Sequence, residues 1–220
     1  MSERWATFDC YGTLVDWNGG MGRELGRLWP DADVDELLHR YHEIEPRVEL
    51  EGSLPYREVL RQSLILLAES EGLELPAEEE GALGDALPSW PVFPEVPGAL
   101  AELRERGWRL VPLSNADADF LDASMAAVGV PFDGLVVAGD IGSYKPAHGH
   151  WKAFAERFQP ERGRHVHVAA SLFHDIAPAE ELGLPAVWIN RLEEMSDLPR
   201  AGELTDLSDL PDTLDRILPG

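Results

Sequence analysis

The feature that most constrains the fold is a regular alternation of short apolar runs with segments of helical periodicity. Five runs have the length and composition of buried strands: residues 5–9, 109–113, 134–138, 165–170 and 186–190. Helical segments precede the last four of them, at residues 98–106, 120–128, 150–158 and 177–182. Strands that alternate with helices favour a parallel sheet covered on both faces. The sequence therefore predicts an α/β fold.

Residues 15–92 interrupt this alternation, because they contain helical periodicity and no convincing strand. Amphipathic segments occur at residues 21–29, 34–47, 55–71 and 77–90. A run of spaced prolines, Pro88 to Pro97, then brings the chain back toward the sheet. We therefore predict a sheet-bearing core of residues 1–14 and 93–220 and an inserted helical domain of residues 15–92.

The charge of the chain restricts its partners. Its 41 acidic and 18 basic residues give a formal net charge of −23, which argues against binding to nucleic acid or to an anionic membrane. Cys10 is the single cysteine, so neither an internal disulfide nor a zinc site with several thiolates is expected. The first residues lack a signal-peptide pattern, and no apolar run is long enough to span a bilayer. We expect a cytoplasmic protein.

Polar and charged residues gather where the predicted strands end. Asp9 ends the first strand, Ser114 and Asn115 follow the second, and Lys145 and Asp175 follow the third and fourth. Ligands of parallel sheets bind beyond the carboxyl ends of the strands. An aspartate at the tip of a buried strand, followed by a glycine turn, is well placed to act as a nucleophile.

The order of these residues resembles the four motifs of the haloacid dehalogenase superfamily, and most of all those of its 2-haloacid dehalogenase branch. The matching positions are Asp9 and Thr13, Ser114 and Asn115, Lys145, and Asp175. The resemblance covers nearly the whole chain. It implies a Rossmann-like core with a helical cap, Asp9 as nucleophile and a covalent aspartyl intermediate.

Two departures separate this chain from the magnesium-dependent phosphatases of the same superfamily. Those enzymes carry an acid two residues after the nucleophile, which protonates the leaving alcohol, but this chain has Tyr11 there. A halide leaves without a proton, so this loss spares dehalogenation. Ala170 replaces an aspartate that binds magnesium in the phosphatases. Both departures favour a site without metal or other cofactor, and magnesium is expected only under the phosphatase alternative.

The resemblance also implies a role for each matched residue. Asp9 attacks the carbon that bears the halogen, Lys145 keeps Asp9 ionised, Thr13 orients Asp9, and Asp175 orients Lys145 or the water that hydrolyses the ester. The substrate is a small anion. Its carboxylate is expected at Ser114, Asn115, Ser171 and the backbone amides of Cys10 and Tyr11.

The leaving halide needs a cation as well. Arg40 stands at a distance from Asp9 similar to that of the halide-binding arginine of the dehalogenase branch, with Arg47 and Arg57 as competitors. Arg40 equally fits an ordinary surface position, paired with Glu36 or Glu43.

One departure also concerns the dehalogenase branch itself. That branch carries an asparagine three residues before the last aspartate, where this chain has Leu172. We hypothesise that His174, next to Asp175, acts as the base for ester hydrolysis. Asp175 equally fits the N-cap of the helix that follows.

The sequence predicts a hydrolase of carbon–halogen bonds that acts on short 2-haloalkanoic acids without metal. A magnesium-dependent phosphatase and a catalytically idle relative that binds an anion or a partner protein are the alternatives. Family resemblance also suggests a homodimer.

Overall fold

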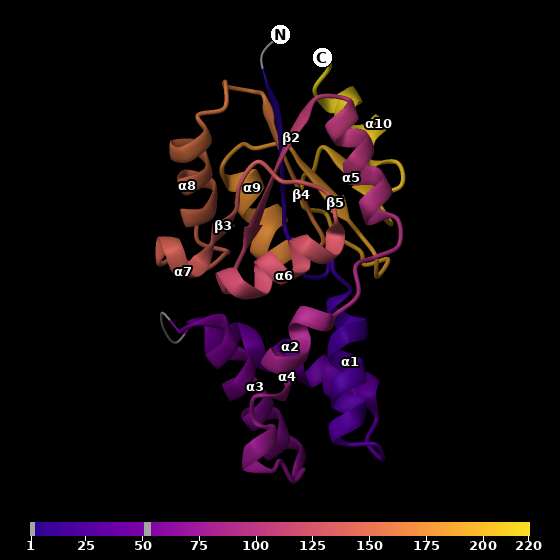
Figure 1. Cartoon of the computed structure of the whole chain (residues 1–220), viewed down its shortest axis with the longest axis vertical. Helices are drawn as coiled ribbons and strands as arrows, with labels where there is room; N and C mark the ends of the chain where they lie inside the picture. Colours follow the sequence, from indigo (N-terminus) through magenta and orange to yellow (C-terminus); the bar gives the residue numbers. More distant parts are fainter. Residues whose placement is uncertain (1–2, 51–53) are drawn as a thin grey trace.

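A computed structural model describes residues 3–50 and 54–220, and its centre is a parallel sheet (Figure 1). The six strands lie in the order β3-β2-β1-β4-β5-β6, and every pairing between neighbours is parallel. Their bounds are β1 Arg4–Phe8, β2 Trp108–Ser114, β3 Val136–Val137, β4 His165–Ala169, β5 Ala186–Ile189 and β6 Gly202–Leu204. The predicted α/β fold is confirmed.

Helices cover both faces of the sheet, as the alternation of strand residues requires. On one face, Ala6 and Phe8 of β1 lie in an apolar cluster with α5 (Val96–Glu105) and α10 (Leu210–Ile217). On the other face, Trp5 packs against α8 (Gly149–Phe158), which Figure 1 shows on the opposite side of the sheet from α5. Helix α6 (Ala118–Val128) contributes Val128 to the cluster of α5 and α10, while the short helices α7 (Ala138–Ile141) and α9 (Ala177–Glu181) lie on the side of α8.

The segment between β1 and α5 forms a separate group of helices beyond the carboxyl ends of the strands (Figure 1). Its members are α1 Trp17–Leu28, α2 Val34–Leu50, α3 Tyr56–Glu71, η1 Ala77–Glu79, α4 Ala82–Ala86 and η2 Leu87–Ser89. They pack around fully buried side chains such as Met21, Tyr41 and Leu64. This apolar cluster explains why the apolar residues of the segment recur at helical spacing.

Among the elements that differ from the sequence prediction are a divided helix and an additional strand. The expected helix over residues 77–90 is divided into η1, α4 and η2, because Gly81 precedes α4 and Pro88 has no amide hydrogen to continue it. The sixth strand, β6, was not predicted. Its three residues are too few to show a period, and their register with β5 depends on contacts distant in sequence.

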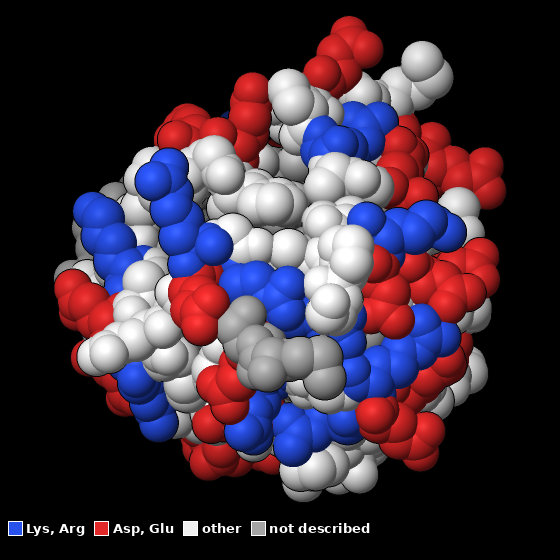
Figure 2. Space-filling model, turned by 90° about the horizontal axis from the view of Figure 1, so that it is seen from above, with Lys and Arg blue, Asp and Glu red and all other residues white. Residues whose placement is uncertain are grey.

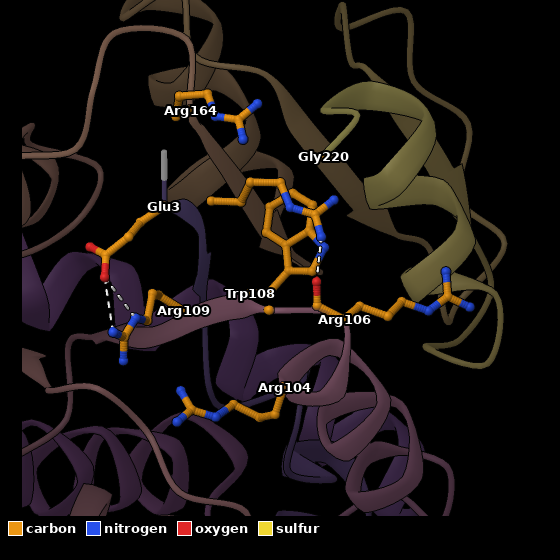
Figure 3. A pocket seen from close by; sticks show the side chains of 9 residues that line it. Glu3, Arg104, Arg106, Trp108, Arg109, Arg164 and Gly220 are labelled. Atoms are coloured by element: carbon orange, nitrogen blue, oxygen red, sulfur yellow. Dashed lines mark hydrogen bonds and ion pairs between the residues drawn. The ribbon is translucent and has the colours of Figure 1, made fainter. Parts of the chain in front are cut away.

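Arginines gather at the amino-terminal edge of the sheet, around a pocket of about 420 Å³ (Figures 2 and 3). The arginines that line it are Arg4, Arg104, Arg106, Arg109 and Arg164. All five guanidinium groups donate to protein acceptors: carboxylates such as Asp215 and Glu3 for the first four, and the carbonyl of Pro219 for Arg164. Figure 2 shows acidic side chains interleaved with the basic ones. Because the arginines that line this pocket are paired with acceptors of the protein itself, we interpret them as an ion-pair network at the amino-terminal edge of the sheet.

No helix within residues 3–50 or 54–220 combines the length and apolarity required to cross a membrane.

Candidate active site at the carboxyl ends of the strands

A cavity of about 740 Å³ lies between the carboxyl ends of the strands and the inserted helices. The sheet side contributes the predicted residues Asp9, Tyr11, Ser114, Asn115, Lys145, Ser171, His174 and Asp175. The inserted helices contribute Trp17, His42, Glu45 and Glu49, among others. The structure thus brings residues from four strand ends into one cavity, as expected for a parallel sheet.

Lys145 joins two carboxylates at the floor of this cavity. Its Nζ lies 2.8 Å from Asp9 Oδ1 and 2.8 Å from Asp175 Oδ1. Thr13 Oγ1 donates to Asp9 Oδ2 over 2.8 Å, and Thr13 itself accepts a bond from the amide of Ala170. Both oxygens of Asp9 are therefore held in place, beside a cation that is only 2% exposed.

The electrostatic surroundings of Lys145 and Asp175 favour the charged forms of both side chains. Burial would lower the pKa of Lys145, but the nearby Asp175 and Asp9 outweigh burial and raise this pKa above its usual value. Burial would likewise raise the pKa of Asp175, but Lys145 and a hydrogen bond from His167 lower it below its usual range. Lys145 and Asp175 are therefore an ammonium and a carboxylate at neutral pH.

A buried chain of polar groups supports Asp175 from beneath. His167 Nε2 lies 2.9 Å from Asp175 Oδ1, and its Nδ1 lies 2.8 Å from Thr7 Oγ1. Thr7 also contacts His165 Nε2 at 2.7 Å. The sequence does not predict this role of His167. It depends on the pairing of β4 with β1, which sets His167 opposite Thr7.

Asn115 holds the backbone of Lys145. Its Oδ1 accepts a bond of 2.7 Å from the amide of Lys145, and its Nδ2 donates over 3.1 Å to the carbonyl of Lys145. Ser114 Oγ accepts from the amide of Ala116. Cys10 is fully buried, and burial raises the pKa of its thiol, so its side chain is an unreactive core group.

His174 contacts both the sheet-bearing core and the inserted helices. Its Nδ1 lies 3.1 Å from Ser171 Oγ, and its Nε2 lies 3.2 Å from Glu49 Oε2 on helix α2. Burial would lower the pKa of His174, but the hydrogen bond and charge of Glu49 outweigh this effect and raise it. Sequence reasoning missed Glu49. Its spacing of four residues from Glu45 places both carboxylates on one face of α2.

Arg40 does not line the cavity. The neighbouring Tyr41 is fully buried, so Arg40 faces solvent one position along helix α2, with its side chain 47% exposed. Its guanidinium pairs with Glu43 at 2.9 Å and also approaches Glu36 and Glu71. Its position therefore gives no support to the expected contact with the halide.

The other arginines considered for the halide also lie elsewhere. Arg57 pairs with Asp119 at 2.8 Å and stacks over Phe120, and Arg47 is exposed. The arginine among the described lining residues is Arg191, which donates to the carbonyl of Thr13 and to Glu95.

We expect the substitution Arg40→Gln to change the steady-state rate of the enzyme less than about twofold and its free energy of unfolding by less than about 0.5 kcal/mol. The reason is that exposed ion pairs contribute little in water. Initial rates and urea unfolding would check this. A loss of activity above about tenfold would show that Arg40 reaches the substrate in a state other than the one described here.

Within the part of the chain that the structure describes, no group of three histidine, cysteine or acidic side chains is arranged to hold a metal ion. Tyr11 and Ala170 occupy the two positions at which phosphatases of the superfamily carry carboxylates. The Tyr11 hydroxyl instead pairs with Ser124 Oγ at 2.9 Å.

The chain is similar to known proteins in sequence and in fold. The family model of haloacid dehalogenase-like hydrolases matches residues 4–183. The (S)-2-haloacid dehalogenase of Pseudomonas sp. (strain YL) is 28% identical over 213 residues, which cover 87% of this chain and 86% of that protein.

Solved structures share the fold over almost the whole chain. The L-2-haloacid dehalogenase RSc1362 superimposes with a TM-score of 0.87 at 23% identity, covering 98% of this chain and 100% of that one. The L-2-haloacid dehalogenase of Xanthobacter autotrophicus with covalently bound chloropropionic acid gives a TM-score of 0.82 at 19% identity, covering 96% and 97%. Because the family model spans most of the sequence, including all of the residues around Asp9, Lys145 and Asp175, this chain belongs to the haloacid dehalogenase-like hydrolases.

Proposed function

We propose that this hydrolase cleaves the carbon–halogen bond of short 2-haloalkanoic acids through an ester on Asp9, without a metal ion. The observation that carries the proposal is the buried group of Asp9, Lys145 and Asp175, joined by two contacts of 2.8 Å at the floor of the cavity. Lys145 supplies positive charge between these two carboxylates. Relatives named for haloacid dehalogenation support the same chemistry.

In the first step, a carboxylate oxygen of Asp9 attacks the carbon that bears the halogen. The new carbon–oxygen bond forms as the carbon–halogen bond breaks, and the halide leaves with the bonding electron pair. No proton is needed. This agrees with Tyr11, because burial raises the pKa of its phenol and makes it a poor proton donor, and its hydroxyl pairs with Ser124.

In the second step, water attacks the carbonyl carbon of the ester, which restores Asp9 and releases the 2-hydroxy acid. Asp175 Oδ2 is buried and has no hydrogen-bond partner within the described residues, so it is suited to accept a hydrogen bond from this water. Lys145 offsets the charge that develops on the ester oxygen. His174 is able to take the proton of the water only after a ring nitrogen is released, since Ser171 and Glu49 engage both.

We also propose that residues 15–92 act as a cap on the cavity. Side chains of α1 and α2 line its upper part, opposite Asp9 and Lys145. A cap of this kind excludes water from the charged floor during the first step, when water would compete with the substrate.

The origin of the product oxygen tests this proposal. With enzyme in excess over 2-chloropropionate in ¹⁸O-water, a single turnover is expected to give unlabelled lactate and ¹⁸O in the peptide that carries Asp9, because the first product oxygen comes from Asp9. Halide release is expected to persist in the presence of a chelator.

Three other outcomes would overturn the proposal. Label in the first-turnover lactate would mean that water attacks the substrate directly. Phosphate release from a phosphoester that the chelator stops, with no halide release, would favour the magnesium-dependent phosphatase. Neither activity in a folded sample would favour a catalytically idle relative.

A further inference from the structure

We propose that the carboxylate of Glu49 occupies the subsite for the substrate carboxylate while the enzyme is empty, and so sets the affinity for anionic substrates. The inference rests on the proposed function, because it concerns where a haloacid binds in the same cavity.

The position of Glu49 is the first argument. Its side chain is 8% exposed and lines the cavity, although it belongs to helix α2 of the inserted segment. One oxygen, Oε1, accepts a bond of 3.3 Å from Asn115 Nδ2, and the other, Oε2, lies 3.2 Å from His174 Nε2. Two donors from the core thus bind the two oxygens of one carboxylate, as they would bind a carboxylic acid ligand.

The remaining polar atoms of these two donor residues are already engaged. Asn115 Oδ1 accepts from the Lys145 amide, and His174 Nδ1 contacts Ser171. The donors that these two residues offer to a carboxylate in the cavity are therefore Asn115 Nδ2 and His174 Nε2, which Glu49 already binds. A substrate carboxylate that uses them has to displace Glu49, because two carboxylates do not share one pair of donors without strong repulsion.

Two features make the displacement accessible. The contacts of Glu49, at 3.2 and 3.3 Å, are long compared with the 2.8 Å contacts of Lys145, and therefore weaker. Pro46 lies inside α2, three residues before Glu49, and lacks the amide hydrogen that would bond to the preceding turn. The last turn of α2 is therefore held less firmly than an uninterrupted helix.

The charges around Glu49 match a role in selecting anions. Glu45 lies one turn earlier, and burial together with the charge of Glu49 raises its pKa to about 8, so Glu45 is neutral below that pH. His42, on the same helix, lines the cavity, and its imidazole pairs with Asn18. Asp9, Lys145 and Asp175 face the cavity from the core. Glu49 is therefore the carboxylate of α2 that touches the donors Asn115 and His174.

The substitution Glu49→Gln tests the proposal through the binding of propionate, a product-like acid that is not turned over. Calorimetric titration at pH about 5.5 keeps Glu45 neutral, and a second titration at pH about 7 detects any contribution from His174, whose pKa burial lowers once the charge of Glu49 is removed. We expect propionate to bind about three- to tenfold more tightly to the variant, because a neutral amide competes less well for the donors and does not repel an anion. Propionamide, which is neutral, is expected to bind equally to both.

The matched control is Glu45→Gln, on the same helix and lining the same cavity. Since Glu45 is already neutral at this pH, its replacement is expected to leave propionate binding unchanged. Equal tightening in both variants would overturn the proposal, and so would unchanged or weaker propionate binding in Glu49→Gln. Binding needs no turnover, so the result stands apart from the test of halide release.

Steady-state kinetics with 2-chloropropionate add a second readout. The proposal expects a lower KM in Glu49→Gln with kcat changed less than about threefold. A large fall in kcat with KM unchanged would assign Glu49 to the chemical steps through His174, and would overturn its role as a stand-in for the substrate.

Discussion

Replacing Asp9 with asparagine is expected to lower halide release by about 10⁴-fold or more, because a neutral amide is not a competent nucleophile toward carbon. The fold is expected to survive. Asparagine has the shape of aspartate and keeps an acceptor oxygen for Lys145, which also retains its contact of 2.8 Å with Asp175. Halide would be measured by ion chromatography, and folding by circular dichroism and thermal unfolding.

Asp16 provides the control for this substitution. It lines the same cavity, but its side chain accepts a bond from the amide of Gly19 as the N-cap of helix α1. Asparagine caps helices about as well as aspartate, so Asp16→Asn is expected to preserve both stability and halide release within a few-fold. If Asp9→Asn retained a tenth of the wild-type rate, the covalent mechanism would be wrong.

The residues of the cavity floor were predictable because topology alone brings them together. Once the chain is recognised as alternating strands and helices, the carboxyl ends of neighbouring parallel strands meet at one edge of the sheet. Asp9 and Asn115 directly follow β1 and β2, Lys145 follows β3 after the short helix α7, and Asp175 lies in a helical turn after β4; the structure places all four around one cavity. Their placement at this edge of the sheet could therefore be predicted without knowing any contact between residues distant in sequence.

The upper wall of the cavity was not predictable in the same way. A helix residue turns about one quarter of a circle from its neighbour, so the direction of a side chain depends on how the helix packs against the core. Tyr41 is buried, whereas Arg40, one position earlier and proposed from its distance to Asp9 in the sequence, is exposed. Glu49 reaches Asn115 and His174 only because α2 packs over the strand ends.

The support beneath Asp175 escaped prediction for a related reason. His165 and His167 alternate along β4, and such a pattern is compatible with an ordinary half-buried strand. Their role depends on the pairing of β4 with β1, which sets Thr7 opposite His167. Strand register across a parallel pair is a long-range property that is not written in either strand alone.

Substituting Lys145 with methionine is expected to abolish halide release and to lower the free energy of unfolding by about 3–5 kcal/mol. The loss follows because methionine fills similar space but leaves Asp9 and Asp175 buried without their shared cation. Lys145→Arg is also expected to be inactive. Lys145 is only 2% exposed and its ammonium touches two carboxylates, so the larger, planar guanidinium of arginine does not fit in its place. Halide release and urea unfolding at pH 7 would measure both effects.

Lys152, the other lysine of the chain, supplies the matched control. It is exposed on helix α8, so Lys152→Met is expected to change neither activity nor stability appreciably. A similar loss of stability in both variants would show that replacing a lysine with methionine is itself harmful, and would remove the support for the buried ion group.

The dependence of stability on pH separates the loss of the cation from a simple packing defect. In the wild type the pKa of Asp175 lies below its unfolded value, so its contribution is present above pH about 4 and is lost as the pH falls further. Without Lys145, burial raises this pKa with only His167 to oppose it, and the native state then binds protons more tightly than the unfolded chain. Lys145→Met is therefore expected to lose stability between pH about 4.5 and 7.5, measured by urea unfolding, relative to the wild type over the same range. Parallel pH profiles for the two proteins would mean that Lys145 contributes through packing and not through its charge.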